Sequence, residues 1–142
     1  MTHRVLVVDD DPGSRQTAEA MLLPLRLELR ILDGGAAALA ELAAPPADLL
    51  VCDVMMPGVD GYAVCRAVRA DPRWRYTPVI LLTALGDPGA IIAGLEAGAD
   101  QFATKPVEGA VLRARVQAML RVRERYLALE QAAPPGDRLA EL

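Results

Sequence analysis

The stretch that decides the fold is Val5-Leu6-Val7-Val8-Asp9-Asp10-Asp11-Pro12, in which an apolar run ends abruptly in three acids. A second stretch, Leu49-Leu50-Val51-Cys52-Asp53, ends in the same way further along the chain. In an open parallel sheet, the carboxyl ends of the strands meet in the crevice where such folds bind ligands. Carboxylates gathered there would repel one another unless a cation lay among them. The two stretches therefore predict an oxygen-ligated site for a divalent cation, with Mg²⁺ as the expected ion.

The rest of the chain alternates apolar runs with Ala-rich segments, which predicts an α/β fold. Runs of Val, Ile and Leu without polar alternation fit strands that are buried on both faces of a parallel sheet. Strands that alternate with helices indicate βαβ units with right-handed crossovers. We expect strands at 5–9, 27–32, 48–53, 78–83 and 101–104, and helices at 14–23, 36–44, 61–70, 89–97 and 108–131. Helix starts are marked by Asp11-Pro12, Asp60-Gly61 and Asp87-Pro88.

The composition is that of one ordinary folded domain. The chain has 142 residues, of which 53% are hydrophobic and 24% charged, so a disordered chain is excluded. A net charge of −4 argues against direct nucleic-acid binding, which depends on phosphate neutralisation. The two cysteines, Cys52 and Cys65, are interpreted as core thiols. We see no membrane span and no signal peptide, so we expect a cytoplasmic protein without membrane contact.

The last helix is expected to extend beyond the domain. We predict that residues 1–122 form the domain and that 123–142 form an extended C-terminal helix and a linker tail. The helix arginines fall all around its axis, which favours a scattered, solvated set. Arg123 projects onto the apolar face, which suggests that the helix has left the domain body by then. The spacing of three, four and three residues resembles a short coiled-coil seam and suggests a homodimer through this helix. The residues concerned are Met119, Val122, Tyr126 and Leu129.

Polar residues stand at the carboxyl ends of four of the expected strands. Asp9 to Asp11 follow the first strand and Asp53 ends the third, while Thr83 ends the fourth and Lys105 follows the fifth. Acids that hold a metal, a carboxylate nucleophile, a hydroxyl donor and an ammonium make up a plausible phosphoryl-transfer site.

The chain resembles a response-regulator receiver domain of the CheY-like kind over roughly residues 4–120. Four motifs in order carry the resemblance, at residues 7–12, 53–62, 82–84 and 94–106. The resemblance implies a flavodoxin-like (βα)5 fold, with a doubly wound five-stranded parallel sheet in the order 2-1-3-4-5. Similarity is closest to receivers that precede cyclic-dinucleotide output domains. We expect no output domain within this chain, which is either a stand-alone receiver or part of a longer protein.

The resemblance also implies a role for each acidic residue of the site. Asp53 would be the phosphoacceptor, taking a phosphoryl group from a sensor histidine kinase or a phosphotransfer protein. Asp10 and Asp53 would bind Mg²⁺ directly, with Mn²⁺ able to substitute. The backbone carbonyl of Met55 would add a third protein ligand, and Asp9 would act through water. Asp11 is interpreted as the helix cap rather than a ligand.

Further roles follow for the residues around the phosphoryl group. Thr83 and Lys105 would contact the phosphoryl oxygens, and Phe102 would change rotamer as Thr83 moves, although simple packing is the alternative for Phe102. The Lys105-Pro106 peptide would be cis. The expected chemistry is Mg²⁺-dependent self-phosphorylation and slow autodephosphorylation, without other enzyme activity. Slow hydrolysis is expected because Met55 and Leu85, which flank the route of the attacking water, are both apolar.

Three other functions fit the residues less well. A phosphatase of the haloacid-dehalogenase type needs a second acid two residues after its nucleophile, where this chain has Met55. A Rossmann nucleotide-binding domain needs a glycine-rich first loop, whereas the loop here carries acids. A receiver-shaped scaffold that is never phosphorylated is disfavoured by the complete set of site residues.

Overall fold

The computed structural model describes residues 2–84 and 86–132. Within them, strands and helices alternate along the chain, with one short 3-10 turn (η1) after the first helix. The elements are β1 (Arg4–Val8), α1 (Pro12–Leu22), η1 (Leu23–Leu25), β2 (Glu28–Leu32), α2 (Gly35–Glu41), β3 (Leu49–Asp53), α3 (Gly61–Ala70), β4 (Val79–Thr83), α4 (Pro88–Glu96), β5 (Gln101–Thr104) and α5 (Gly109–Ala132).

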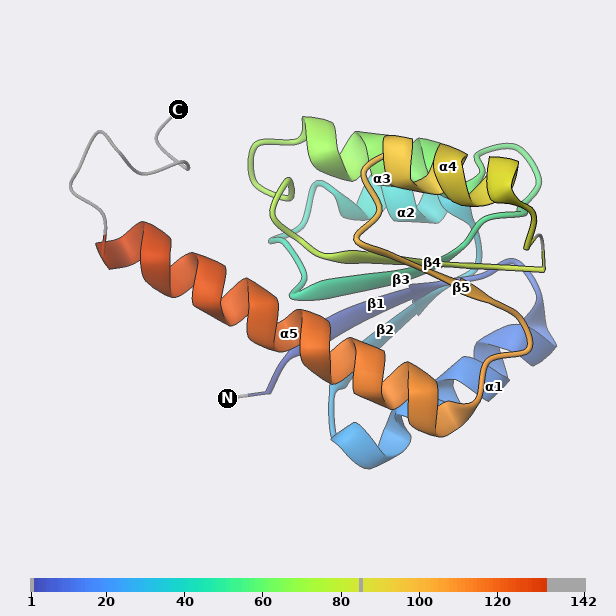
Figure 1. Cartoon of the computed structure of the whole chain (residues 1–142), viewed down its shortest axis with the longest axis horizontal. Helices are drawn as coiled ribbons and strands as arrows, with labels where there is room; N and C mark the ends of the chain where they lie inside the picture. The colour runs from blue at the N-terminus through green and yellow to red at the C-terminus, as the bar shows by residue number, and fades with distance from the viewer. Residues whose placement is uncertain (1, 85, 133–142) are drawn as a thin grey trace.

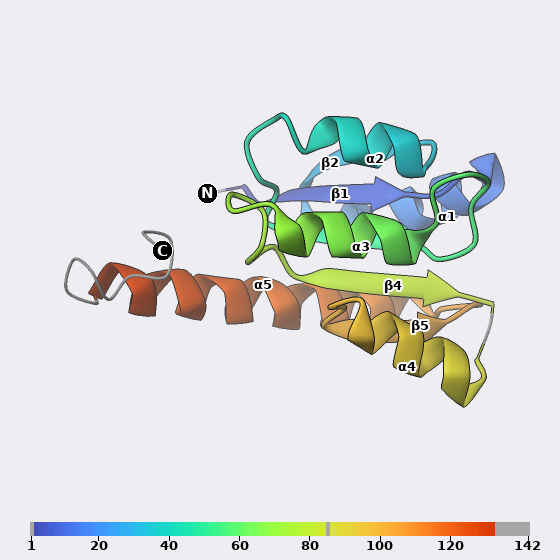
Figure 2. The ribbon, with the colours of Figure 1, turned by 90° about the horizontal axis from the view of Figure 1, so that it is seen from above.

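The sheet has the predicted parallel topology, with strand order β2-β1-β3-β4-β5. Helices α2, α3 and α4 cover one face, and α1 and α5 cover the other (Figure 1). Figure 2 looks onto the α2–α4 layer, with the strands beneath it. The order of the strands reverses between β1 and β3, and ligands of doubly wound folds bind at that point. The doubly wound flavodoxin-like prediction is confirmed.

Successive residues of the central strands enter opposite halves of the core. Val5 and Val7 pack in the cluster formed with α1 and α5, whereas Leu6 and Val8 pack in the cluster formed with α2 and α3. Because both faces of β1 are covered by helices, every residue of this run must be apolar. That is the physical reason for the uninterrupted apolar run before Asp9.

The three predicted helix caps are confirmed. The carboxylates of Asp11, Asp60 and Asp87 each accept a hydrogen bond from the backbone N–H three residues later, at 2.8, 2.9 and 2.8 Å. Each bond satisfies a donor that the first helical turn leaves without a partner. Asp11 therefore acts as the cap of α1, as the sequence favoured over a ligand role.

Two details of the fold differ from the sequence-based expectation. Helix α2 ends at Glu41 rather than at residue 44, because the N–H groups of Ala43 and Ala44 bond to carbonyls only three residues back. Strand β2 is not buried on both faces, since it lies at the edge of the sheet and Glu28 and Arg30 are exposed. An edge strand has a neighbour on one side only, and charged side chains there discourage pairing with another chain.

The C-terminal half of α5 still packs on the domain body, contrary to the expectation drawn from Arg123. The Arg123 side chain is only 16% exposed and donates a hydrogen bond of 2.7 Å to the Asp48 carboxylate, just before β3. One turn later, the Tyr126 ring lies 4.9 Å from the Tyr76 ring, centroid to centroid. A guanidinium on the apolar face is therefore accommodated by a carboxylate of the body, which a helical projection alone cannot reveal.

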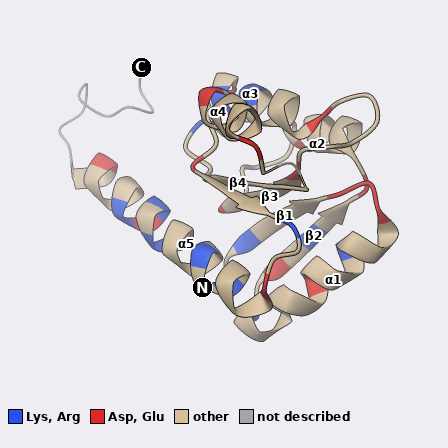
Figure 3. Ribbon diagram, turned by 45° about the vertical axis from the view of Figure 1, so that its right-hand side comes forward, with Lys and Arg blue, Asp and Glu red and all other residues tan. Residues whose placement is uncertain are grey.

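The expectation of solvated helix arginines is also wrong in part. Basic residues recur along α5 (Figure 3). Arg113 donates to the carbonyl of Met21, and Arg115 donates to the side chain of Gln101. The predicted linker, residues 133–142, lies outside the described residues. Among residues 2–84 and 86–132, every helix is too short or too polar to cross a bilayer.

Replacing Arg123 by alanine should loosen the end of α5. The loss of a half-buried, charge-assisted hydrogen bond to Asp48 should cost about 1–2 kcal/mol in the free energy of unfolding. Amide hydrogen exchange in the last turns of α5 should become faster. Arg121→Ala is the matched control, because Arg121 is exposed on the same helix. Unchanged exchange in Arg123→Ala would contradict the contact with the body.

Candidate functional site

The register of the sheet brings the acids of two distant segments together. Val8, the last residue of β1, pairs with Cys52 of β3. Asp9, which follows β1 directly, and Asp53, which ends β3, are therefore neighbours. Both residues are buried, at 5% and 8% exposure. The point between β1 and β3 where the strand order reverses therefore carries two acids side by side, as predicted, and both are buried.

The register also brings the hydroxyl and the lysine to the same edge. Thr83 ends β4 opposite Thr104 of β5, and Lys105 follows directly. Thr83 is fully buried, and its carbonyl accepts a hydrogen bond of 2.7 Å from the Lys105 N–H. The Lys105-Pro106 peptide is cis, as predicted.

The Lys105 ammonium bridges the two buried carboxylates. Its Nζ lies 3.0 Å from Oδ2 of Asp9 and 3.1 Å from Oδ1 of Asp53. Burial raises the pKa of Asp53, and although the hydrogen bond and charge of Lys105 act to lower it, the pKa stays above the ordinary value. Burial acts to lower the pKa of Lys105, but its bonds to Asp9 and Asp53 outweigh burial and raise it. The lysine thus stays charged and partly compensates the acids.

The acidic group is suited to a hard cation. One carboxylate oxygen each of Asp9, Asp10 and Asp53 lies within 4.8 Å of the other two. An all-oxygen donor set of this kind matches Mg²⁺, which favours a few carboxylates and retains several waters. Met55 lies two residues after Asp53 in the β3–α3 loop, with its side chain 59% exposed. The residues present therefore fit the cation that the sequence predicts.

Phe102 belongs to β5, and its ring faces α4. Its ring is partly buried against the α2–α4 core cluster, and it lies so close to Gly94 that a Cβ there would be 2.7 Å from a ring carbon. In this structure the Phe102 ring is packed against its neighbours, as in the alternative of simple packing. The expected change of its rotamer stays a prediction.

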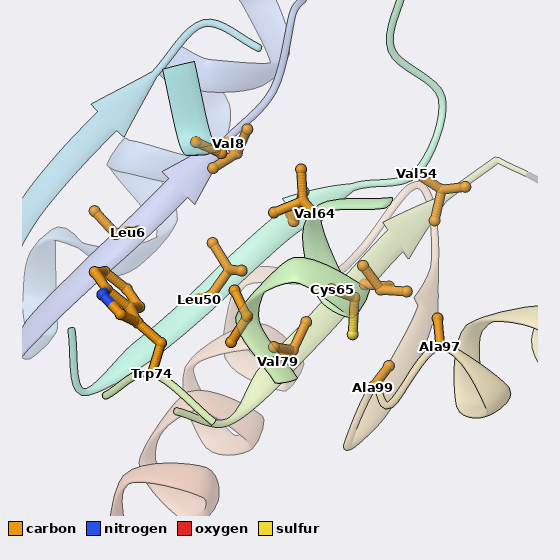
Figure 4. Packing of buried hydrophobic residues seen from close by; sticks show 14 of the residues in the cluster. Leu6, Val8, Leu50, Val54, Val64, Cys65, Trp74, Val79, Ala97 and Ala99 are labelled. Carbon is orange, nitrogen blue, oxygen red and sulfur yellow. The ribbon is translucent and has the colours of Figure 1, made fainter. Parts of the chain in front are cut away.

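Two residues that matter for the site were not identified from the sequence. Gly61 begins α3 so close to the end of β3 that a Cβ would lie 2.4 Å from the carbonyl oxygen of Asp53. The Gly61 N–H also donates to the carbonyl of Val54, a core residue that lies near Val64 and Cys65 (Figure 4).

The second residue is Arg15 of α1, which donates a hydrogen bond of 2.8 Å to the backbone carbonyl of Asp9. The Asp-Gly dipeptide was a signal for a close turn, whereas nothing local singled out Arg15.

A cleft of about 550 Å³ opens beside the acids. Asp9, Asp53 and Lys105 are among the residues that line it, and the rest of the lining comes from the strands, from α1 and from the segment between Pro106 and Leu112. Most of this lining is apolar.

Comparisons with known proteins agree with this geometry. The family model described as the response regulator receiver domain matches residues 5–117. The response regulator PleD of Caulobacter vibrioides is 41% identical over 139 residues, which are 98% of this chain and 31% of PleD. This chain therefore spans about a third of that relative.

Solved structures show the same fold. The signal receiver domain of a signal transduction histidine kinase from Syntrophus aciditrophicus is 37% identical, with a TM-score of 0.79 over 84% of this chain and 91% of that one. The receiver domain of the sensor histidine kinase PA1611 from Pseudomonas aeruginosa PAO1 is 29% identical, with a TM-score of 0.78 over 84% of this chain and 98% of that one. The latter was crystallised with a magnesium ion coordinated in its active site cleft.

Replacing Asp53 by asparagine should stabilise the metal-free domain at neutral pH. A raised pKa in the folded state means that ionised Asp53 opposes folding. The protonated carboxyl favours the folded state, and this stabilisation is lost as the pH rises through the raised pKa. Urea unfolding without metal should show Asp53→Asn more stable than wild type at pH 7, and the difference should shrink as acid protonates Asp53. Asp33→Asn, which removes an exposed charge, is the control. A less stable Asp53→Asn at pH 7 would contradict the prediction.

Proposed function

The chain belongs to the response-regulator receiver family, and from that premise we propose that it takes a phosphoryl group onto Asp53 as the phosphoacceptor of a two-component system. The observation that carries the proposal is the Lys105 ammonium, which lines the cleft and lies within 3.1 Å of both Asp9 and Asp53. It puts positive charge where phosphoryl oxygens would arrive, next to a carboxylate able to act as nucleophile.

In the proposed reaction, a carboxylate oxygen of Asp53 attacks phosphorus as the P–N bond of a phosphohistidine breaks. The electron pair of that bond leaves with the imidazole of the donor. Lys105 then turns from Asp9 toward a phosphoryl oxygen, and the Thr83 hydroxyl donates to another. Asp10, Asp53 and the Met55 carbonyl would hold Mg²⁺, with Asp9 acting through water and Mn²⁺ able to substitute. The bound cation supplies charge neutralisation for the phosphoryl oxygens.

The signalling surface would change through Thr83 and Phe102. Thr83 is buried beside the site, and the Phe102 ring packs against Gly94 of α4. Movement of Thr83 toward a phosphoryl oxygen would leave space for the ring, and the phosphate would thereby favour a second arrangement already accessible to the domain. The packed position of Phe102 would then belong to the unphosphorylated state.

The partners we propose are a sensor histidine kinase or phosphotransfer protein on one side and an output domain on the other. We include an output domain in the proposal because the chain spans only 31% of the length of PleD. A homodimer through α5 would use Val122 and Leu129, which are exposed, because Met119 and Tyr126 already contact the domain itself. A cytoplasmic location agrees with the free thiols of Cys52 and Cys65.

Phosphorylation at Asp53 is tested by incubating the chain with Mg²⁺ and an acyl phosphate and then measuring the intact mass. The wild type should gain one phosphoryl group, and chelation of Mg²⁺ should prevent the gain. Asp53→Asn should gain none, while the control Asp33→Asn should behave as wild type. An equal gain in Asp53→Asn would move the acceptor elsewhere, and an unchanged wild-type mass would count against the proposed chemistry.

The proposed aspartyl phosphate should hydrolyse slowly because the Met55 side chain cannot orient a water. Met55→Asn should speed the loss of phosphate severalfold, as followed by intact mass after removal of the donor. Ile92→Asn, at another exposed apolar position, is the matched control. Leu85, the second predicted residue, lies outside the described residues. An unchanged lifetime in Met55→Asn would contradict the role of this side chain.

A further inference from the structure

Asp9 is held from three directions by three different donors. Its Oδ2 accepts from Lys105 at 3.0 Å, and its Oδ1 accepts from the backbone N–H of Asp11 at 2.9 Å. Its backbone carbonyl accepts from the Arg15 guanidinium at 2.8 Å. Lys105 and Asp11 therefore orient the carboxylate, whereas Arg15 orients the main chain.

Arg15 reaches back from the first turn of α1 to the end of β1. Its own N–H donates to the carbonyl of Asp11 at 2.9 Å, so its backbone belongs to the first helical hydrogen bonds. Its side chain then closes the loop that contains Asp9, Asp10 and Asp11. The loop is thus tied at both ends, by the Asp11 cap of α1 and by the Arg15 contact with Asp9.

The orientation of the Asp9 carbonyl restricts where the Asp10 side chain can lie. The carbonyl of Asp9 and the N and Cα of Asp10 share one planar peptide unit. A hydrogen bond that fixes this carbonyl therefore also fixes the N–Cα bond of Asp10, and so narrows the range of positions that the Asp10 side chain can take. Asp10 is one of the three acids whose oxygens gather within 4.8 Å.

The charge of Arg15 acts in the opposite sense. A guanidinium beside a group of acids repels an incoming cation, so removal of this charge alone should tighten cation binding. Loss of the hydrogen bond should weaken binding, because groups that orient metal ligands typically contribute a large part of the affinity. The sign of the change therefore distinguishes positioning from simple electrostatics.

We propose that Arg15 is a positioning residue of the cation site, which aligns Asp10 by holding the backbone carbonyl of Asp9. The inference rests on the proposed function, because it concerns the same Mg²⁺ site. Arg15 does not touch the phosphoryl group in this role. It acts on the site through the main chain of β1 and so links the position of α1 to the affinity for the cation.

The test is calorimetric titration of Mg²⁺ into wild type, Arg15→Ala and Arg15→Lys. Arg15→Ala should bind Mg²⁺ on the order of tenfold more weakly. Arg15→Lys, which keeps the charge and one shorter donor, should recover part of the affinity. Arg113→Ala is the matched control, because Arg113 also donates a single guanidinium bond to a backbone carbonyl, that of Met21. Its affinity should equal that of wild type.

A second readout needs no metal. The amide resonance of Asp11, whose N–H donates to Asp9, should shift in metal-free Arg15→Ala and stay in place in Arg113→Ala. Equal or tighter Mg²⁺ binding by Arg15→Ala would overturn the inference while leaving the proposed function standing. A wild type that binds no Mg²⁺ would overturn the cation part of the proposed function and this inference with it. If Arg15→Ala does not fold, an unweakened affinity in Arg15→Lys, together with an unmoved Asp11 amide, overturns the inference.

Discussion

Mutual repulsion of buried carboxylates is the constraint on which the site depends. Asp9 and Asp53 lie side by side because β1 and β3 are neighbours, and burial makes their negative charge costly. Lys105, which is separated from Asp9 by 96 positions in the chain, provides the compensating charge at 3.0 Å. The site therefore exists only when the first, third and fifth strands are all in place. Any cation or phosphoryl group that binds there redistributes charge among these same groups.

Helix α5 connects the site end of the sheet with the opposite ends of the strands. It begins shortly after Lys105 and Pro106, and Arg123 and Tyr126 in its C-terminal half contact residues near the amino ends of β3 and β4. The Arg123 bond to Asp48 and the tilted contact of the Tyr126 ring with the Tyr76 ring hold the C-terminal half of α5 on the domain. A single helix thus runs from beside the acids to the amino ends of the central strands.

Most of the fold could be predicted from the sequence because its signals are local. The apolar run before Asp9 and the caps Asp11, Asp60 and Asp87 each reflect a nearby physical requirement. The errors arose where partners are distant. The position of Arg123 on the apolar face suggested that the helix had left the domain body. Its actual partner, Asp48, lies 75 positions away in the chain, and no periodicity points to it. The exposure of β2 agrees with its place at the sheet edge and with Glu28 and Arg30, which alternate with apolar residues along it.

The sequence by itself determined which chemical groups the site contains: acids after two strands, a hydroxyl after another, and a lysine before a proline. It could do so because strand ends and motif spacing are properties of the chain order. Only the tertiary structure decided how these groups meet, with Lys105 between Asp9 and Asp53 and Arg15 on the Asp9 carbonyl. Those contacts depend on strand register and on helix placement against the sheet, which arise from packing of the whole core rather than from any one segment.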